Sequence, residues 1–260
     1  MAPHTAFIIP YRNRQAHKKE MDVYLDNLMS ARQWTTEDVV VVYAHQCDNR
    51  PFNRGGMKNC GFIGVRDTFP DDYGDMNIVF HDVDSIPEDI HLFPYSTTQG
   101  VVAHYYGFTH VLGGILTIKG RDFEACNGFP SLWGWGVEDN ELQKRVLQNN
   151  MTIDRSVFVG IKETTKMRPM GQERVKIVSR TEAAMFKNET DLGGLSQVSD
   201  VDYRIENEMM NIRTFSVPRA FSNNEFSRED MKLTRGKILL NTIIYLFDIR
   251  YHHPLCIYIT

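Results

Sequence analysis

The stretch Ile78-Val79-Phe80-His81-Asp82-Val83-Asp84-Ser85-Ile86-Pro87 joins an apolar run to a pair of carboxylates. Residues 78–80 are β-branched or aromatic and follow the turn-like Asp-Asp-Tyr-Gly-Asp at 71–75, so they predict a buried strand. Asp82 and Asp84 come directly after this strand, where the sheets of α/β proteins bind ligands. Carboxylate oxygens there suit Mg²⁺ or Mn²⁺ carrying a substrate diphosphate. A solvated turn after the strand is the alternative interpretation.

A second informative segment, residues 129–140, reads Phe-Pro-Ser-Leu-Trp-Gly-Trp-Gly-Val-Glu-Asp-Asn. Trp133 and Trp135 offer flat apolar faces, and the glycines beside them permit a tight backbone path and the close approach of a ligand. Glu138 and Asp139 come at the predicted start of a helix. Aromatic faces beside carboxylates suit a sugar ring, and a carboxylate there is able to take a proton from an attacking hydroxyl. The alternative is a packed turn whose acidic residues merely favour a helix N-terminus.

Strand and helix signals alternate along the chain. Predicted strands cover residues 6–9, 38–44, 77–80, 101–104, 110–118 and 157–160, with a late strand pair at 203–216, and predicted helices cover 14–30, 54–66, 138–148 and 235–249. Strands separated by helices indicate an α/β fold with a mostly parallel central sheet and helices on both faces. The polar, aperiodic residues 162–180 are interpreted as a mobile lid. We expect one catalytic domain over residues 1–215, followed by a linker and an amphipathic helix in 216–260 that packs on it or serves association.

The composition is typical of one compact enzyme domain. The chain has 260 residues, of which 42% are hydrophobic and 24% charged. A net charge of −4 provides no basic field, which argues against nucleic acid as a partner. The chain has no signal-peptide pattern and no apolar run long enough to span a bilayer, so we expect a cytoplasmic protein without an anchor, of the kind a bacterium or virus would use. The four cysteines show no metal-ligand spacing and are expected to be reduced.

Four blocks of sequence, in this order, resemble the beta-1,4-galactosyltransferase family of inverting, nucleotide-sugar-dependent glycosyltransferases. They are Ile-Ile-Pro-Tyr-Arg-Asn-Arg at 8–14, Phe-Asn-Arg at 52–54, Asp-Val-Asp at 82–84, and Gly113-Gly114 followed by the Trp-rich segment up to Asp139. The resemblance extends over roughly residues 5–190. It implies a single-domain GT-A (Rossmann-like) fold, a UDP-sugar donor, and a glycan or glycoconjugate acceptor.

The resemblance also implies a role for each matched residue. The implied donor- and nucleotide-binding residues are Pro10, Tyr11, Arg12, Arg14, Phe52, Arg54, Asp82, Val83, Asp84, Gly113, Gly114, Trp135, Gly136 and Glu138. Asp84 is the implied direct ligand of Mn²⁺ or Mg²⁺, the expected cofactor. Asp139 matches the catalytic base, and the implied acceptor-binding residues are Trp135, Asp139 and Asn140. Surface charge is the alternative for Arg12 and Arg14, and core packing is the alternative for Phe52.

The predicted lid departs from the family pattern, in which a Met and a His three residues apart complete the metal site. Here Met167 and Met170 have that spacing, and methionine stands in the histidine position. Thioethers are poor ligands for hard divalent ions. Metal binding is therefore expected to rest on Asp84 with the diphosphate and water, or to recruit Glu163. Packing of the loop by both methionines is an equally open interpretation.

Two further departures bear on the substrates. Val111-Leu112 stands where the galactosyltransferases carry a bulky Tyr-Phe, which leaves room for an N-acetyl group on the donor sugar. UDP-Gal, UDP-GalNAc, UDP-GlcNAc and UDP-Glc therefore all stay open as donors. Asn140 replaces an aspartate that helps orient the acceptor, so the acceptor is not fixed.

Two other classes of function stay open. A catalytically inactive UDP-sugar- or glycan-binding protein of the same fold would explain the missing lid histidine. A metal-dependent phosphotransferase or nucleotidyltransferase of similar topology would explain the paired aspartates, although not the Trp-Gly-Trp-Gly run. Release of UDP from a UDP-sugar distinguishes a transferase from both.

Overall fold

The structure is a computed structural model that describes residues 2–134, 136–163, 165–168, 175–176, 192–219 and 231–232. Its helices are α1 (Gln15–Arg32), α2 (Arg54–Thr68), α3 (Gly120–Ala125) and α4 (Glu138–Gln148), with a 3₁₀ turn at Leu195–Gln197. Its strands are β1 (Thr5–Tyr11), β2 (Val39–Gln46), β3 (Asn77–His81), β4 (Val101–Gly107), β5 (Ile115–Lys119), β6 (Thr152–Asp154), β7 (Val159–Gly160), β8 (Val175–Lys176), β9 (Ser199–Glu206), β10 (Met209–Ser216) and β11 (Met231–Lys232).

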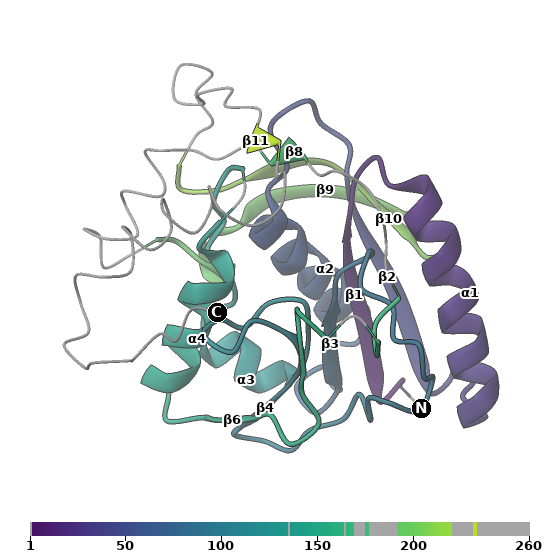
Figure 1. The fold of residues 1–260 in the computed structure, drawn as a ribbon. Coiled ribbons are helices and arrows are strands. Elements are labelled where there is room, and N and C mark those ends of the chain that lie inside the picture. The colour runs from purple at the N-terminus through teal and green to yellow at the C-terminus, as the bar shows by residue number, and fades with distance from the viewer. Residues whose placement is uncertain are drawn as a thin grey trace.

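One mixed sheet of nine strands organises the chain, in the order β6-β4-β5-β3-β1-β2-β10-β9, with β7 also paired to β4 (Figure 1). The central strands β3, β1, β2 and β10 run parallel, whereas β5 pairs antiparallel with both β3 and β4, and β9 pairs antiparallel with β10. The prediction of a mostly parallel α/β sheet is confirmed. Short β8 and β11 form a separate two-stranded pair.

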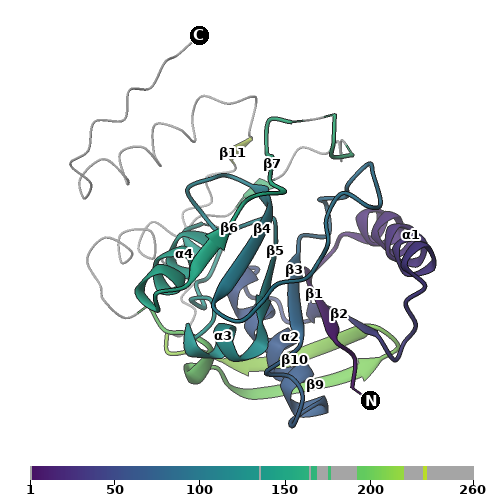
Figure 2. The ribbon, with the colours of Figure 1, turned by 90° about the horizontal axis from the view of Figure 1, so that it is seen from below.

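Alternation along the central strands places helices on both faces of the sheet. In β1, Ala6 and Ile8 belong to the apolar cluster that includes residues of α2, α3 and α4, whereas Phe7 and Ile9 belong to the cluster that includes residues of α1. Successive side chains of a strand point to opposite faces, so one strand contributes to both clusters. Figure 1 and Figure 2 show α1 on one side of the sheet and α2 on the other.

Helix α2 packs unusually close to the sheet. A Cβ on Gly61 would lie 2.5 Å from Cγ2 of Ile8 in β1, so only a residue without a side chain fits at this contact. The N-cap of α2 is Asn53, whose side chain accepts a hydrogen bond from the backbone N–H of Gly56. This cap and contact fix where the first turn of α2, beginning at Arg54, lies relative to the ends of the strands.

The sequence-based predictions and the structure differ in several elements. The strand predicted at 110–118 begins only at Ile115, because residues 108–114 form a turn whose end, Gly114, has φ +76°. Helix α3 and strand β6 were not predicted. The helix expected at 235–249 and most of the expected lid lie outside the described residues. In the described part of the chain, no helix is both long and apolar enough to cross a membrane.

Candidate active site

Three carboxylates and two cations from distant parts of the chain meet beside the carboxyl end of β3. Arg54 opens α2, Asp82 follows β3, and Glu138 and Asp139 open α4. Arg54 forms ion pairs with Asp82, with Glu138 at 3.3 Å and with Asp139 at 3.6 Å. Lys58, one turn further along α2, lies 3.3 Å from Oδ1 of Asp139. The structure thus brings together four residues for which the sequence predicted separate roles, and it adds Lys58.

Burial and neighbouring charges act differently on the members of this cluster. Burial alone would lower the pKa of Arg54, but the carboxylates of Asp82, Asp139 and Glu138 outweigh it and raise that pKa well above its usual value. Burial raises the pKa of Glu138, and the neighbouring charge of Asp139 raises it further. The Glu138 side chain is only 5% exposed, against 17% for Asp139. Asp139 is therefore the more accessible of the two carboxylates at the start of α4.

The segment before α4 is held against α2 by Asn59. Its buried amide donates to the backbone oxygen of Phe129 at 2.8 Å and accepts from the N–H of the same residue at 3.0 Å. A Cβ on Gly55 would lie 2.0 Å from the carbonyl oxygen of Pro130, so the two backbones are in direct contact. Asn53 also forms an isolated bridge with Gly134. These contacts place the Trp-Gly-Trp-Gly loop, and with it the start of α4, beside the N-terminus of α2.

The backbone of this loop is constrained immediately before the acidic pair. Gly136 donates its N–H to Oε2 of Glu138 at 3.0 Å, with φ +124°. Val137, the N-cap of α4, has φ +60°, which is a rare conformation for a β-branched residue. Trp135 lies outside the described residues, so its predicted contacts with donor and acceptor stay predictions. Asn140, in the first turn of α4, is half-buried.

Gly113 and Gly114 belong to a backbone segment that lies against the start of α4. A Cβ on Gly113 would lie 2.3 Å from Oδ2 of Asp139, and the N–H of Leu112 donates to the backbone oxygen of Asp139 at 3.1 Å. Gly114 accepts a hydrogen bond from the N–H of Asp82 at 3.1 Å. The backbone of residues 112–114 therefore bonds to both the Asp-Val-Asp turn and Asp139, and Gly113 leaves the space that the Asp139 carboxylate occupies.

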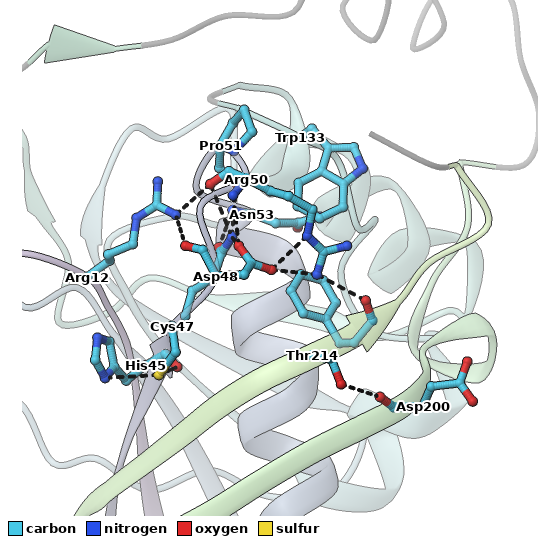
Figure 3. A network of polar contacts seen from close by, with 12 residues as sticks. Arg12, His45, Cys47, Asp48, Arg50, Pro51, Asn53, Trp133, Asp200 and Thr214 are labelled. Atoms are coloured by element: carbon cyan, nitrogen blue, oxygen red, sulfur yellow. Dashed lines mark hydrogen bonds and ion pairs between the residues drawn. The ribbon is translucent and has the colours of Figure 1, made fainter. Parts of the chain in front are cut away.

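Several residues that the resemblance assigns to nucleotide binding lie close together at the ends of β1 and β2. Tyr11 is buried with its ring edge against His45, and Arg14 is half-buried just before α1. Figure 3 shows Arg12 pointing toward the loop that follows β2. Arg12 donates to the backbone oxygen of Arg50 at 2.6 Å and lies 5.6 Å from the ring centroid of Phe52. Burial lowers the pKa of Arg12, and nearby Asp48 opposes that shift.

Sequence reasoning missed Arg50, which fastens this loop to the Trp-rich segment. Its guanidinium lies 4.5 Å from the ring centroids of both Trp133 and Phe215, and it donates to the carboxylate of Asp48 (Figure 3). Trp133 is itself 2% exposed. This tryptophan is therefore part of the packed framework, as the packed-turn alternative expected for the segment.

Sequence reasoning also missed Lys58, although a signal was present. Lys58 is four residues after Arg54 in a predicted helix, and residues at this spacing lie on the same helix face. Apart from Asn59, the other residues of α2 from Gly55 to Val65 are small or apolar, which marks Lys58 as a charged residue in a buried stretch. Helical spacing from a predicted site residue was the clue.

The predicted metal ligands are only partly brought together. Asp84 is half-buried three residues after the end of β3, and Val83 is buried. Met167 is 5% exposed and belongs to the same apolar cluster as Val83, so packing accounts for its position. Glu163 is exposed and forms an ion pair with Lys166 at 3.6 Å. Met170 lies outside the described residues.

The described residues contain no group of three or more His, Cys, Asp or Glu side chains arranged to hold a metal ion. Part of the predicted lid does lie beside the Asp-Val-Asp turn, because Arg168 donates its N–H to the oxygen of Ile86 at 2.7 Å and Glu88 donates to that of Lys166 at 2.9 Å. The carboxylate of Asp84 is the right type of ligand for a hard divalent cation. Its role as a metal ligand, and that of the other candidate residues, stays a prediction.

Comparisons with known proteins show which family the sequence matches. Residues 1–95 match the family model described as the N-terminal region of glycosyl transferase group 7, and residues 97–170 match the one described as the N-terminal domain of galactosyltransferase. The chain is 33% identical to mouse Beta-1,4-galactosyltransferase 1 over 165 residues, which are 60% of this chain and 40% of the relative. It is 31% identical to human Beta-1,4-galactosyltransferase 3 over 161 residues, 58% of this chain and 39% of the relative.

A solved structure shares the fold. The catalytic domain of Drosophila beta1,4galactosyltransferase 7, in complex with xylobiose, superposes with a TM-score of 0.62 at 19% identity, over 82% of this chain and 94% of that one. The chain spans about 40% of the length of the curated relatives that it matches. The two family models follow one another along residues 1–170, and all four sequence blocks lie within them. The chain therefore belongs to the beta-1,4-galactosyltransferase family.

Proposed function

We propose that this protein is an inverting glycosyltransferase that moves a sugar from a UDP-sugar to a hydroxyl of a glycan acceptor and forms a beta linkage. The observation that carries the proposal is the position of Asp139. Its carboxylate is partly exposed at the start of α4, and its two oxygens face two different cations, Lys58 and Arg54. These two cations hold the carboxylate in place, as a general base requires.

The reaction is a single displacement. Asp139 accepts the proton of the acceptor hydroxyl while the oxygen of that hydroxyl bonds to the anomeric carbon of the donor sugar. The bond from the anomeric carbon to the diphosphate breaks, and its electron pair leaves with UDP. Because the acceptor attacks opposite the leaving group, the configuration at the anomeric carbon inverts.

Glu138 is better suited to holding a substrate than to taking its proton. One of its oxygens pairs with Arg54 and the other accepts the N–H of Gly136, and the side chain is almost fully buried. A carboxylate in this position orients a hydroxyl of the donor sugar, as the family resemblance implies. Val111 and Leu112 are both buried, and the choice among UDP-Gal, UDP-GalNAc, UDP-GlcNAc and UDP-Glc stays open.

The family resemblance and the chemistry of Asp84 support a divalent cation, Mn²⁺ or Mg²⁺, beside the Asp-Val-Asp turn. A solved structure of a mutant of the Drosophila enzyme is described as a complex with manganese, UDP-Gal and xylobiose. A cation bound by Asp84 would offset negative charge on the departing diphosphate. Arg12 and Arg14, at the ends of the neighbouring strand and helix, would contribute positive charge on the nucleotide side.

Release of UDP tests this proposal without a known acceptor, because transferases slowly pass the donor sugar to water. The purified protein is incubated with each of the four UDP-sugars in MnCl₂, MgCl₂ or EDTA, and free UDP is measured. We expect turnover of at least one donor that requires the metal. Binding of UDP without release from any donor would favour the inactive binding protein instead.

The substitution Asp139→Asn tests the base. We expect UDP release and transfer to fall by about 10²–10⁴-fold, the usual contribution of a positioned general base, while UDP binding stays within about twofold. Glu124→Gln, on the exposed surface of α3, is the matched carboxylate-to-amide control and should leave both unchanged. Wild-type activity in Asp139→Asn would remove Asp139 from this role.

A further inference from the structure

We propose that Lys58 is a positioning residue for the general base, because its buried ammonium holds the Asp139 carboxylate in one orientation. The inference rests on the proposed function, since it assigns Lys58 to the same site. No other residue of the described chain combines full burial, a permanent donor and direct contact with the predicted base.

The two carboxylate oxygens of Asp139 face different cations. Lys58 Nζ lies 3.3 Å from Oδ1, whereas Arg54 Nη1 lies 3.6 Å from Oδ2. The main-chain oxygen of Asp139 is held independently by the N–H of Leu112 at 3.1 Å. Only Lys58 makes a hydrogen bond to the carboxylate among the described contacts, so rotation of the carboxylate would break that bond first.

Burial makes this pairing necessary. The Lys58 side chain is 1% exposed, and lysine is almost never fully buried unless its charge is paired. The ammonium also lies 4.3 Å from the ring centroid of Phe129, where the aromatic face attracts a cation but does not neutralise it. Asp139 is the acidic side chain with which Lys58 pairs in the described structure. Each charge therefore stabilises the other.

Charged and titratable groups face Asp139 from several elements. Arg54 and Lys58 face it from α2, and Glu138 lies beside it on α4. Asp82 pairs with Arg54, and His104 on β4 bonds to the oxygen of Gly113. Burial raises the pKa of Glu138, and the charge of Asp139 raises it further.

Lys58 has no access to substrate, which distinguishes positioning from catalysis. Its side chain is 1% exposed and contacts Phe129 and the start of α4, whereas the Asp139 side chain is 17% exposed. Loss of Lys58 should therefore change how and at what pH Asp139 works, and should leave donor binding intact. A merely structural lysine would affect the unfolding free energy without moving the pH profile.

The test is the pH dependence of kcat/KM in Lys58→Met, which keeps an unbranched side chain of similar length and removes its charge. An opposite charge at this distance depresses the pKa of a carboxylate by about one to three units. We expect the acid limb of the profile to move up by about one pH unit or more, with kcat at least tenfold lower at neutral pH and KM for the donor within about twofold. Lys144→Met, a half-exposed lysine paired with Glu141 at 3.4 Å, is the matched control and should keep the wild-type profile.

The outcomes separate this inference from the proposed function. If the wild type turns over no UDP-sugar, the proposed function fails and the base role fails with it. If the wild type is active but Lys58→Met keeps the wild-type acid limb, only the assignment of Lys58 fails.

A second measurement tests the inference even if Lys58→Met folds poorly. Removing one partner of a buried ion pair is strongly destabilising, whereas replacing both is tolerated. In urea unfolding, Lys58→Met/Asp139→Asn should be at least as stable as Lys58→Met alone. A double variant whose loss equals the sum of the two single losses would show that the residues are uncoupled and would overturn the inference.

Discussion

At the scale of single residues, the site depends on where the backbone is left without side chains or forced into rare conformations. Gly113 leaves the space that the Asp139 carboxylate occupies, and Gly136 has φ +124°, where side chains are rarely tolerated. Val137 has φ +60° despite its branched side chain. Such strain costs about 1–3 kcal/mol and persists only where the surroundings impose it. Here the contacts of Gly136 and Glu138 hold the strained residue directly before the acidic pair.

Gly113→Ala should disable the base without unfolding the protein. The added Cβ would lie 2.3 Å from Oδ2 of Asp139, so the carboxylate must move away from its position. A displacement of about 1 Å in a catalytic group costs on the order of 100-fold in rate, and we expect that loss in kcat/KM with UDP binding retained. Gly74→Ala is the control, because its Cβ would meet Arg121 only at 3.7 Å. A fully active Gly113→Ala would show that Asp139 does not need this position.

At the scale of secondary-structure elements, His104 fastens β4 to the glycine pair. Arg155 donates to its Nδ1 at 3.0 Å, so Nδ1 is the acceptor and Nε2 carries the proton that bonds to the oxygen of Gly113 at 2.9 Å. Arg155 also donates to Gln143 on α4 at 2.9 Å. One histidine thus connects strand, turn and helix behind Asp139, and it does so only in its neutral form.

This connection predicts a loss of stability in acid. Burial is the main cause that lowers the pKa of His104 to about 4, whereas an unfolded histidine titrates near 6.5. The unfolded state therefore binds the proton first, and the contribution of His104, up to about 3 kcal/mol, is complete above pH 6.5 and is lost as the pH falls toward 4. Urea unfolding at pH 7.5 and 4.5 measures this difference. The difference in unfolding free energy between the two pH values should shrink in His104→Gln and persist in the exposed His91→Gln. Equal pH dependence in the wild type and both variants would refute the role of His104.

At the scale of the whole molecule, the sheet carries the site at the carboxyl ends of its central parallel strands. Apolar clusters on both faces fix α1 on one side and α2, α3 and α4 on the other. Strand β10 completes this frame beside β2 and buries Met210, Ile212 and Phe215. The oxygen of Arg219, just beyond it, accepts the indole N–H of Trp133 at 3.0 Å.

The frame predicts how the chain tolerates truncation. A protein ending at Arg219 keeps all strands of the large sheet and the Trp133 contact, so we expect cooperative urea unfolding and UDP binding. A protein ending at Glu208 loses β10 with its three buried apolar side chains, each of which stabilises by about 1.5–3 kcal/mol, and should not fold. Tryptophan fluorescence during urea unfolding measures whether each of the two truncated proteins folds. Failure of the longer protein to fold would place residues 220–260 within the structural core, against the predicted domain boundary at 215.

Local patterns were sufficient for the elements with strong periodicity. The helix predicted at 138–148 matches α4, and the strand predicted at 77–80 matches β3 except for His81, because these segments show clear local signals. Residues 110–114 of the turn were predicted as strand, since the apolar residues there resemble one. Their conformation depends instead on the glycines and on contacts with Asp139. Four sequence blocks in order, among them the paired aspartates and the Trp-rich segment, were sufficient to predict the family. The metal ligands, Asp84 included, the donor sugar and the cytoplasmic location stay predictions.

The amino-acid sequence by itself determined the α/β class, the family, and Asp139 as the candidate base, because these depend on short-range patterns and on residue types that chemistry requires. Only the tertiary structure decided which charges meet. Arg54 and Lys58 are 84 and 81 residues away in the chain from their partners on α4, Glu138 and Asp139. No local pattern encodes such a pair. It follows from the close packing of α2 on β1 and from the contacts of Asn59, which bring two helix N-termini to one end of the sheet.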